Sequence, residues 1–190
     1  MKIYKLEINI DGYGGHLKDR YFTNYQKAKN CLSQTSGIYH AEDGTWDVYG
    51  MKSCNVYEEN DSFSLIGIQF PKEEWDEWCI RYCRATITPI ELNFTVLDNE
   101  FYLLKYCRGY NHWLYSGLNG HHDTFEDYDM NNQPAILGYY ISRKKARKMA
   151  ARDKSWKKIG RAWVRPEFDK KCSTLGGGQD YLSIDKVVLE

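Results

Sequence analysis

The sequence contains no run of 18 apolar residues, so no segment is long enough to cross a membrane as a helix. Its first residues alternate polar and apolar side chains instead of forming an apolar core, and we therefore predict no secretion signal. It also lacks net charge, because 26 Lys and Arg residues balance 26 Asp and Glu residues. As an average, this balance argues against a highly charged binder of nucleic acid or membranes.

Paired cysteine motifs are missing as well. The six cysteines lie at positions 31, 54, 79, 83, 107 and 172, and the absence of a CxxC pair excludes zinc ribbons and thioredoxin-like redox sites. Without an export signal, the expected compartment is the reducing cytoplasm, where thiols stay free. Cys79 and Cys83 lie four residues apart on a predicted helix and would share one face. We interpret them as small buried hydrophobes, with a metal or redox pair as the alternative.

Apolar and aromatic residues, by contrast, are plentiful. Of 190 residues, 42% are hydrophobic, which is enough to bury a core as one compact domain or two small ones. Sixteen Tyr and six Trp outnumber seven Phe. Aromatic rings with a polar atom suit surfaces that are half buried or that contact partners, which gives mild support to an interaction protein.

Hydrophobic periodicity predicts an α+β protein with a mostly antiparallel sheet and about three helices. One helix is expected from Thr23, as N-cap, to about Leu32. The apolar stripe between Pro71 and Cys83 predicts a second helix, and Ser142 caps a third that ends near Asp153. Strands are expected at 2–10, 16–22, 45–50, 53–58, 63–70, 92–97, 101–107, 112–116, 135–141, 159–165 and 181–189, with a turn at Asp98-Asn99.

The chain divides into two halves, 1–90 and 91–190, which could also form one compact unit. Both halves fit a β-β-α-β pattern, and a duplication would explain why Tyr21-Phe22-Thr23 and Tyr140-Ile141-Ser142 each precede a Lys- and Ala-containing helix. Strand–cap–helix junctions are alike in many proteins, so an unrelated pair of halves is the alternative.

The zero net charge is a sum of separated blocks. Residues 41–77 hold ten acids and two bases, a net of −8, and residues 91–130 hold seven acids and two bases, a net of −5. Residues 143–171 hold thirteen bases and three acids, a net of +10. Half of all Lys and Arg residues therefore lie within 29 consecutive positions.

The basic block predicts a partner-binding surface made of one helix and the strand that follows it. Like charges on a helix repel each other, and an anionic partner would relieve that repulsion. Nucleic acid fits, since bases next to tryptophans can hold phosphates and stack nucleobases. A solvated face, or contact with the chain's own acidic segments in a homo-oligomer, is the alternative. The candidate residues are Arg143, Lys144, Lys145, Arg147, Lys148, Arg152, Lys157, Lys158, Arg161, Arg165, Trp156 and Trp163.

A second candidate site lies in the loop predicted for residues 117–134. His112, His121, His122 and Asp123 offer imidazole and carboxylate groups of the kind that bind zinc, manganese or iron. They would support a metal-dependent hydrolase or nuclease. No HExxH motif is present, and a structural or surface loop without metal is the preferred interpretation; no cofactor is expected.

The Tyr, Asn and Lys content and the phrase Tyr140-Ile141-Ser142-Arg143-Lys144-Lys145-Ala146 resemble small accessory proteins of phages and mobile elements. Some of these are inhibitors of host defence, such as anti-CRISPR proteins. The resemblance assigns no residue roles. It implies a non-enzymatic, cytoplasmic inhibitor that engages a nucleic acid or a nucleic-acid-binding protein complex, for example a host-defence nuclease complex.

Overall fold

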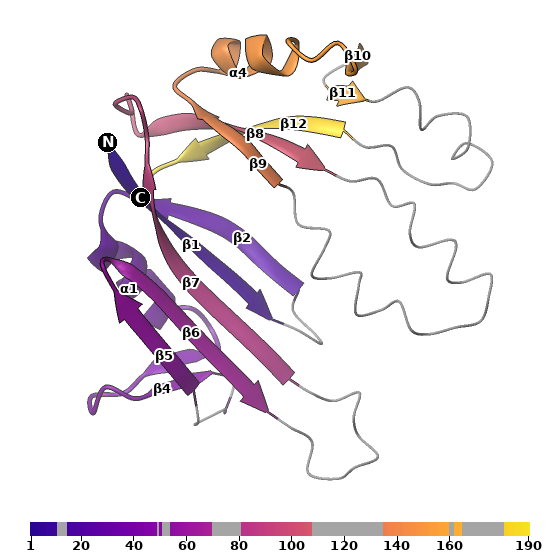
Figure 1. The fold of residues 1–190 in the computed structure, drawn as a ribbon. Coiled ribbons are helices and arrows are strands. Elements are labelled where there is room, and N and C mark those ends of the chain that lie inside the picture. Colours follow the sequence, from indigo (N-terminus) through magenta and orange to yellow (C-terminus); the bar gives the residue numbers. More distant parts are fainter. Residues whose placement is uncertain are drawn as a thin grey trace, which may run out of the picture. The chain divides into compact units, whose positions relative to one another are not determined.

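A computed structural model describes residues 1–10, 15–48, 50, 54–69, 81–107, 135–159, 162–164 and 181–190. They belong to two compact units: unit 1 is residues 1–94 with 189–190, and unit 2 is residues 95–188. The class is α+β with mostly antiparallel strands, as the sequence predicts (Figure 1). The described part of the chain contains two helices rather than about three. Neither of them is long and apolar enough to cross a membrane.

Unit 1 is a five-stranded antiparallel sheet with one helix packed on it. The strand order is β2-β1-β7-β6-β5, and α1 covers one face. Alternate residues of the strands, such as Leu6 and Leu65, meet Ala28 and Leu32 of α1 in the core. The elements are β1 (Lys2–Ile10), β2 (Gly15–Phe22), α1 (Tyr25–Ser33), β5 (Cys54–Glu59), β6 (Ser62–Gln69) and β7 (Arg81–Glu91), with a separate hairpin of β3 (Ile38–His40) and β4 (Trp46–Val48).

The helix expected from Pro71 to Cys83 is wrong over its last residues, and residues 70–80 lie outside the described part. Arg81 begins strand β7, and Cys83 pairs with Ile10 on one side and Gly67 on the other. Cys83, Ala85 and Ile87 alternate with more exposed residues and are all buried. That period of two, which belongs to a strand, outweighs the helical stripe that precedes it.

Two further expectations along unit 1 need correction. The N-cap of α1 is Asn24, whose side chain accepts a hydrogen bond from the Lys27 amide at 2.8 Å, and Thr23 instead bonds the Glu190 carbonyl oxygen. No strand forms at 92–97, because β7 ends at Glu91. The turn at Asp98-Asn99 is confirmed, with both residues in the left-handed region at φ 54° and 55°.

Unit 2 has the same kind of architecture. Its sheet order is β10-β11-β12-β8-β9, every neighbouring pair is antiparallel, and α4 packs on one face. The single strand expected at 159–165 is a short hairpin instead. The elements are β8 (Glu100–Cys107), β9 (Ala135–Tyr140), α4 (Arg143–Ala150), β10 (Lys157–Ile159), β11 (Ala162–Val164) and β12 (Tyr181–Val188).

The two units share one connection pattern when the β3–β4 hairpin is set aside. Counting strands along the chain within each unit, the order across both sheets is second, first, fifth, fourth, third. This order is β2-β1-β7-β6-β5 in unit 1 and β9-β8-β12-β11-β10 in unit 2. In each, the helix follows the second strand and contacts the first, second and last strands. The chain passes from unit 1 to unit 2 after Phe94 and returns to unit 1 at Leu189, which bridges to Tyr21.

Candidate functional site

Helix α4 places a continuous group of bases on the surface of unit 2. Ala146 and Ala150 are buried and Met149 is half-buried, so this stripe faces the sheet beneath. The rest of the helix is exposed because its side chains project away from that stripe. Its exposed bases are Arg143, Lys144, Lys145, Arg147 and Lys148.

Three of these bases lie where the helix itself disfavours them. Arg143, Lys144 and Lys145 form the first turn of α4, which contains no acid. The amino end of a helix carries partial positive charge, so each cation there costs about 0.3–1 kcal/mol at low salt. The Ser142 hydroxyl accepts a hydrogen bond from the Lys145 amide at 3.3 Å, which caps the helix without neutralising this charge.

The bases of α4 are also unpaired within the described part of the chain. No ion pair or side-chain hydrogen bond joins any of them to another described residue, although sheet residues of the same unit do pair. Lys105 lies 3.0 Å from Asp185, and Lys186 lies 2.5 Å from Glu100. Within the described residues, the positive charge of α4 is therefore not offset by an ion pair.

Helix α1 provides a contrast at the equivalent place in unit 1. Lys29 contacts both carboxylate oxygens of Glu58, at 2.8 and 2.7 Å, and Tyr25 donates a hydrogen bond to the same group at 2.5 Å. The Lys29 and Tyr25 hydrogen bonds lower the pKa of Glu58, while burial together with Glu58 raises the pKa of Tyr25. One of the two lysines of α1 is thus neutralised internally.

More bases follow α4 toward β10. Arg152 and Lys154 are exposed in the turn, and Lys157 and Lys158 are exposed on β10. We call these four residues and the five bases of α4 the basic surface. Lys154 was not among the candidate residues, although its position inside the basic block could have identified it. Arg161 and Arg165 lie outside the described residues.

The two tryptophans of the predicted site have different surroundings. Trp163 is 5% exposed and packs with Leu104, Ala150 and Leu182, so its role here is core packing. Trp156 is half-buried; its ring meets Tyr106 edge-on with centroids 5.9 Å apart. Its indole N–H donates to Asp153 at 3.1 Å. Trp156 is thus held by two contacts within unit 2.

The predicted metal ligands His112, His121, His122 and Asp123 all lie outside the described residues. Within the described part of the chain, no group of three or more His, Cys, Asp or Glu side chains is arranged to hold a metal ion. The metal-dependent hydrolase therefore stays a prediction from the sequence. Cys83, proposed as one of a cysteine pair, is buried in the sheet, which raises the pKa of its thiol to about 11.

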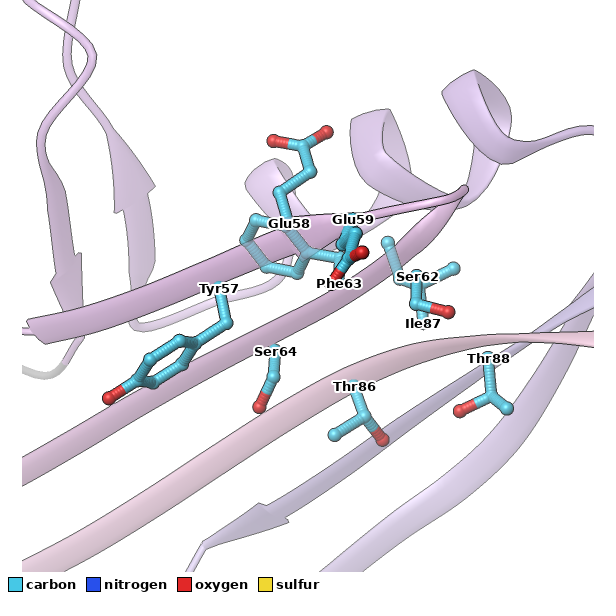
Figure 2. A pocket seen from close by; sticks show the side chains of 9 residues that line it. All are labelled: Tyr57, Glu58, Glu59, Ser62, Phe63, Ser64, Thr86, Ile87 and Thr88. Carbon is cyan, nitrogen blue, oxygen red and sulfur yellow. The ribbon is translucent and has the colours of Figure 1, made fainter.

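A shallow groove of about 240 Å³ lies in unit 1 beside the β5–β6 hairpin. Figure 2 shows Ser64, Thr86 and Thr88 pointing to one side and Glu58 pointing to the opposite side. Glu58 is already occupied by Lys29 and Tyr25. The Glu58 carboxylate therefore does not converge with these three hydroxyl groups (Figure 2). The lining residues are Tyr57, Glu58, Glu59, Ser62, Phe63, Ser64, Thr86, Ile87 and Thr88.

Comparison with known proteins gives no relatives. No protein-family model matches the chain, and no curated protein or solved structure matches it. The described residues define an α+β protein of two units, with a basic helix in unit 2.

Proposed function

We propose that this chain is a non-enzymatic binding protein that engages a nucleic acid or nucleoprotein through the basic surface. The observation that carries the proposal is the unpaired charge of α4, including three cations in its first turn. The three first-turn cations oppose the helix dipole, and the bases of α4 lie three and four residues apart, a cost of a few tenths of a kcal/mol per like-charge pair. A polyanionic partner offsets the cost by supplying the missing counter-charge.

The parallel between the two units supports the same proposal. We infer that they are copies of one β-β-α-β-β-β unit, on the basis of their common strand order and helix contacts. Ala28 and Ala146 are each the fourth residue of their helix, and both are fully buried. Exposed positions differ instead: Gln26 and Asn30 of α1 correspond to Lys144 and Lys148 of α4. The bases therefore distinguish α4 from a helix that packs in the same way.

The resemblance to phage and mobile-element accessory proteins extends the proposal to an inhibitor role. A host-defence nuclease complex combines a nucleic acid with a basic protein groove. Each of these two parts carries charge opposite to one of the charged blocks of this chain. The basic surface would contact the nucleic acid, while the acidic block at 41–77 is the counterpart suited to a basic groove. A pull-down from host lysate, with and without nuclease treatment, distinguishes a protein target from a nucleic-acid target.

Binding across a salt series tests the proposal directly. Labelled DNA and RNA, single- and double-stranded, are titrated with the wild type and with a variant carrying Arg143→Glu, Lys144→Glu, Arg147→Glu and Lys148→Glu. We expect the wild type to bind with an affinity that falls as salt rises, and the variant to lose that binding. Binding that is absent at low salt, or unchanged in the variant, would remove the nucleic-acid version.

Stability measurements show whether such a loss is one of binding or of folding. Lys144→Gln removes a like-charge pair with Lys148 and a cation from the first turn of α4, so it should raise the stability of α4 by a few tenths of a kcal/mol at low salt. The same variant should bind nucleic acid more weakly. A variant that is more stable but binds more weakly shows that the residue serves binding. A residue that serves only the fold would lose stability when it is replaced.

Self-association is the competing interpretation of the same charges. A second copy could place its acidic segments against the basic surface, since the blocks of −8 and +10 are of similar size. Sizing at low and high salt distinguishes the two: an oligomer held by these charges dissociates as salt rises, whereas a monomer at both salts leaves the basic surface for another partner.

A further inference from the structure

We infer that the partner of the basic surface is a B-form DNA duplex and that α4 enters its major groove. This inference rests on the proposed function, and it adds the form of nucleic acid and the way it is held. Two observations lead to it: the distribution of bases around α4 and the surroundings of the nearby aromatic rings.

The bases of α4 surround its exposed surface instead of lying along one edge. Successive helical residues are separated by about 100°. Lys145 and Arg147, the neighbours of buried Ala146, therefore project on opposite flanks of the helix. Lys144 and Lys148, each two residues from Ala146, lie about 160° away from it and form the crest that points away from the sheet. Positive charge thus covers both flanks and the crest.

This distribution matches a partner with phosphates on two sides. A helix with its side chains is about 10–12 Å across, and the major groove of B-form DNA is about 12 Å wide and 8.5 Å deep. Within that groove, Lys145 and Arg147 would face the two phosphate walls, and Lys144 and Lys148 would face the base edges. A single phosphate chain, by contrast, could engage only one flank at a time.

The aromatic residues argue against a single-stranded partner. Proteins that bind single strands without sequence preference stack successive bases on exposed aromatic rings. In the described part of unit 2, no aromatic side chain is among the exposed large hydrophobic residues. Trp163 is in the core, and Trp156 is held by Tyr106 and Asp153.

Double-stranded RNA fits less well for a geometric reason. Its A-form major groove is deep and narrow, so that side chains cannot reach the base edges, and its wide minor groove is shallow. A helix with charge on both flanks and the crest gains contacts on all three sides only in a groove that admits its full width. B-form DNA has such a groove.

The test compares three probes with the full-length protein: a DNA duplex, one of its single strands, and an RNA duplex of matching sequence. We expect the DNA duplex to be bound most tightly at equal salt, with log affinity falling by about 0.9 per phosphate contact for each unit of log salt. Lys145→Gln and Arg147→Gln should each lower that slope by about one on the duplex, because each flank contacts its own strand.

Lys27→Gln is the matched control, since Lys27 is the exposed third residue of α1, as Lys145 is of α4. It should leave DNA binding unchanged, and circular dichroism should show all three variants folded. Equal or tighter binding of the single strand or the RNA duplex would overturn the inference and leave the proposed function standing. A slope lowered by only one of the two flank variants would overturn the groove geometry. No binding to any probe at low salt would overturn the inference together with the nucleic-acid version of the proposed function.

Discussion

Glu58 joins two elements of unit 1 through three hydrogen bonds at its carboxylate. Lys29 and Tyr25 of α1 both donate to this residue of the edge strand β5. Their contacts lower the pKa of Glu58, with the Lys29 hydrogen bond as the main cause. The pair is partly exposed, with 23% of the Lys29 side chain and 42% of the Glu58 side chain accessible. Solvent screening therefore limits its contribution to about 1 kcal/mol or less.

The lowered pKa makes this contribution depend on pH. The folded protein holds Glu58 ionised to lower pH than the unfolded chain, whose glutamates titrate near pH 4.3. The contribution is therefore complete above that pH and disappears as pH falls through the folded pKa. We expect Glu58→Gln to be less stable than the wild type at neutral pH and to approach it at lower pH in urea unfolding. A difference that stays constant from neutral to acidic pH would contradict this account, and Glu59→Gln is the neighbouring control.

At the scale of elements, the two helices begin in the same way. Asn24 and Ser142 have extended backbones, and each side chain accepts a hydrogen bond from the amide three residues later. Replacing either residue with alanine should destabilise its unit by about 1 kcal/mol, the usual value of such a cap. Circular dichroism during thermal unfolding measures the effect.

The two caps differ in what their loss should do to binding. Asn24→Ala should leave affinity for nucleic acid unchanged, whereas Ser142→Ala should weaken it because the fraying first turn carries three of the bases. Equal effects of the two variants on affinity would contradict the assignment of binding to α4. Both proteins need comparison at a temperature where each remains folded.

Strand β1 and helix α4 were predicted from the sequence. Alternation gave β1, and the residues Ser142 to Ala150 gave α4, because in each case the local period and the tertiary environment agree. The prediction of a helix was wrong at residues 81–83, because two patterns meet there. The apolar stripe of a helix precedes these residues, and the alternating pattern of a strand follows them. The period of two in β7 favours the strand, and pairing with β6 and with β1, which is distant in the sequence, stabilises it.

The candidate site was predicted in part for a related reason. Counting charge along the chain located the basic residues, since they are contiguous in sequence. It could not show that Trp163 is in the core, because a strand of three residues gives too little alternation to assign a face. Nor could it foresee that Lys29 pairs with Glu58, since that contact joins residues far apart in the chain.

At the scale of the whole molecule, one strand order occurs twice with different exposed chemistry. Both units bury alanine at the same helix position and keep the same helix-to-sheet contacts. Their exposed helix faces are polar in α1 and basic in α4. Packing constrains the buried positions equally in both units and leaves the exposed ones free to vary, so the charge difference fits a role for the surface of unit 2 alone.

Hydrogen exchange across the whole chain should therefore distinguish the two helices. With a DNA duplex at about 100 times its dissociation constant, binding stabilises the folded state by about 2.7 kcal/mol. Amides that exchange only after the DNA has dissociated should therefore exchange roughly 100-fold more slowly. We expect this slowing in α4, whose amides at Ala146 and Ala151 bond within the helix, and no change in α1. The Lys144→Gln, Lys148→Gln double variant should show much less slowing in α4 at the same DNA concentration. Equal slowing of both helices would show that the two units respond together, and that binding is not confined to the basic surface.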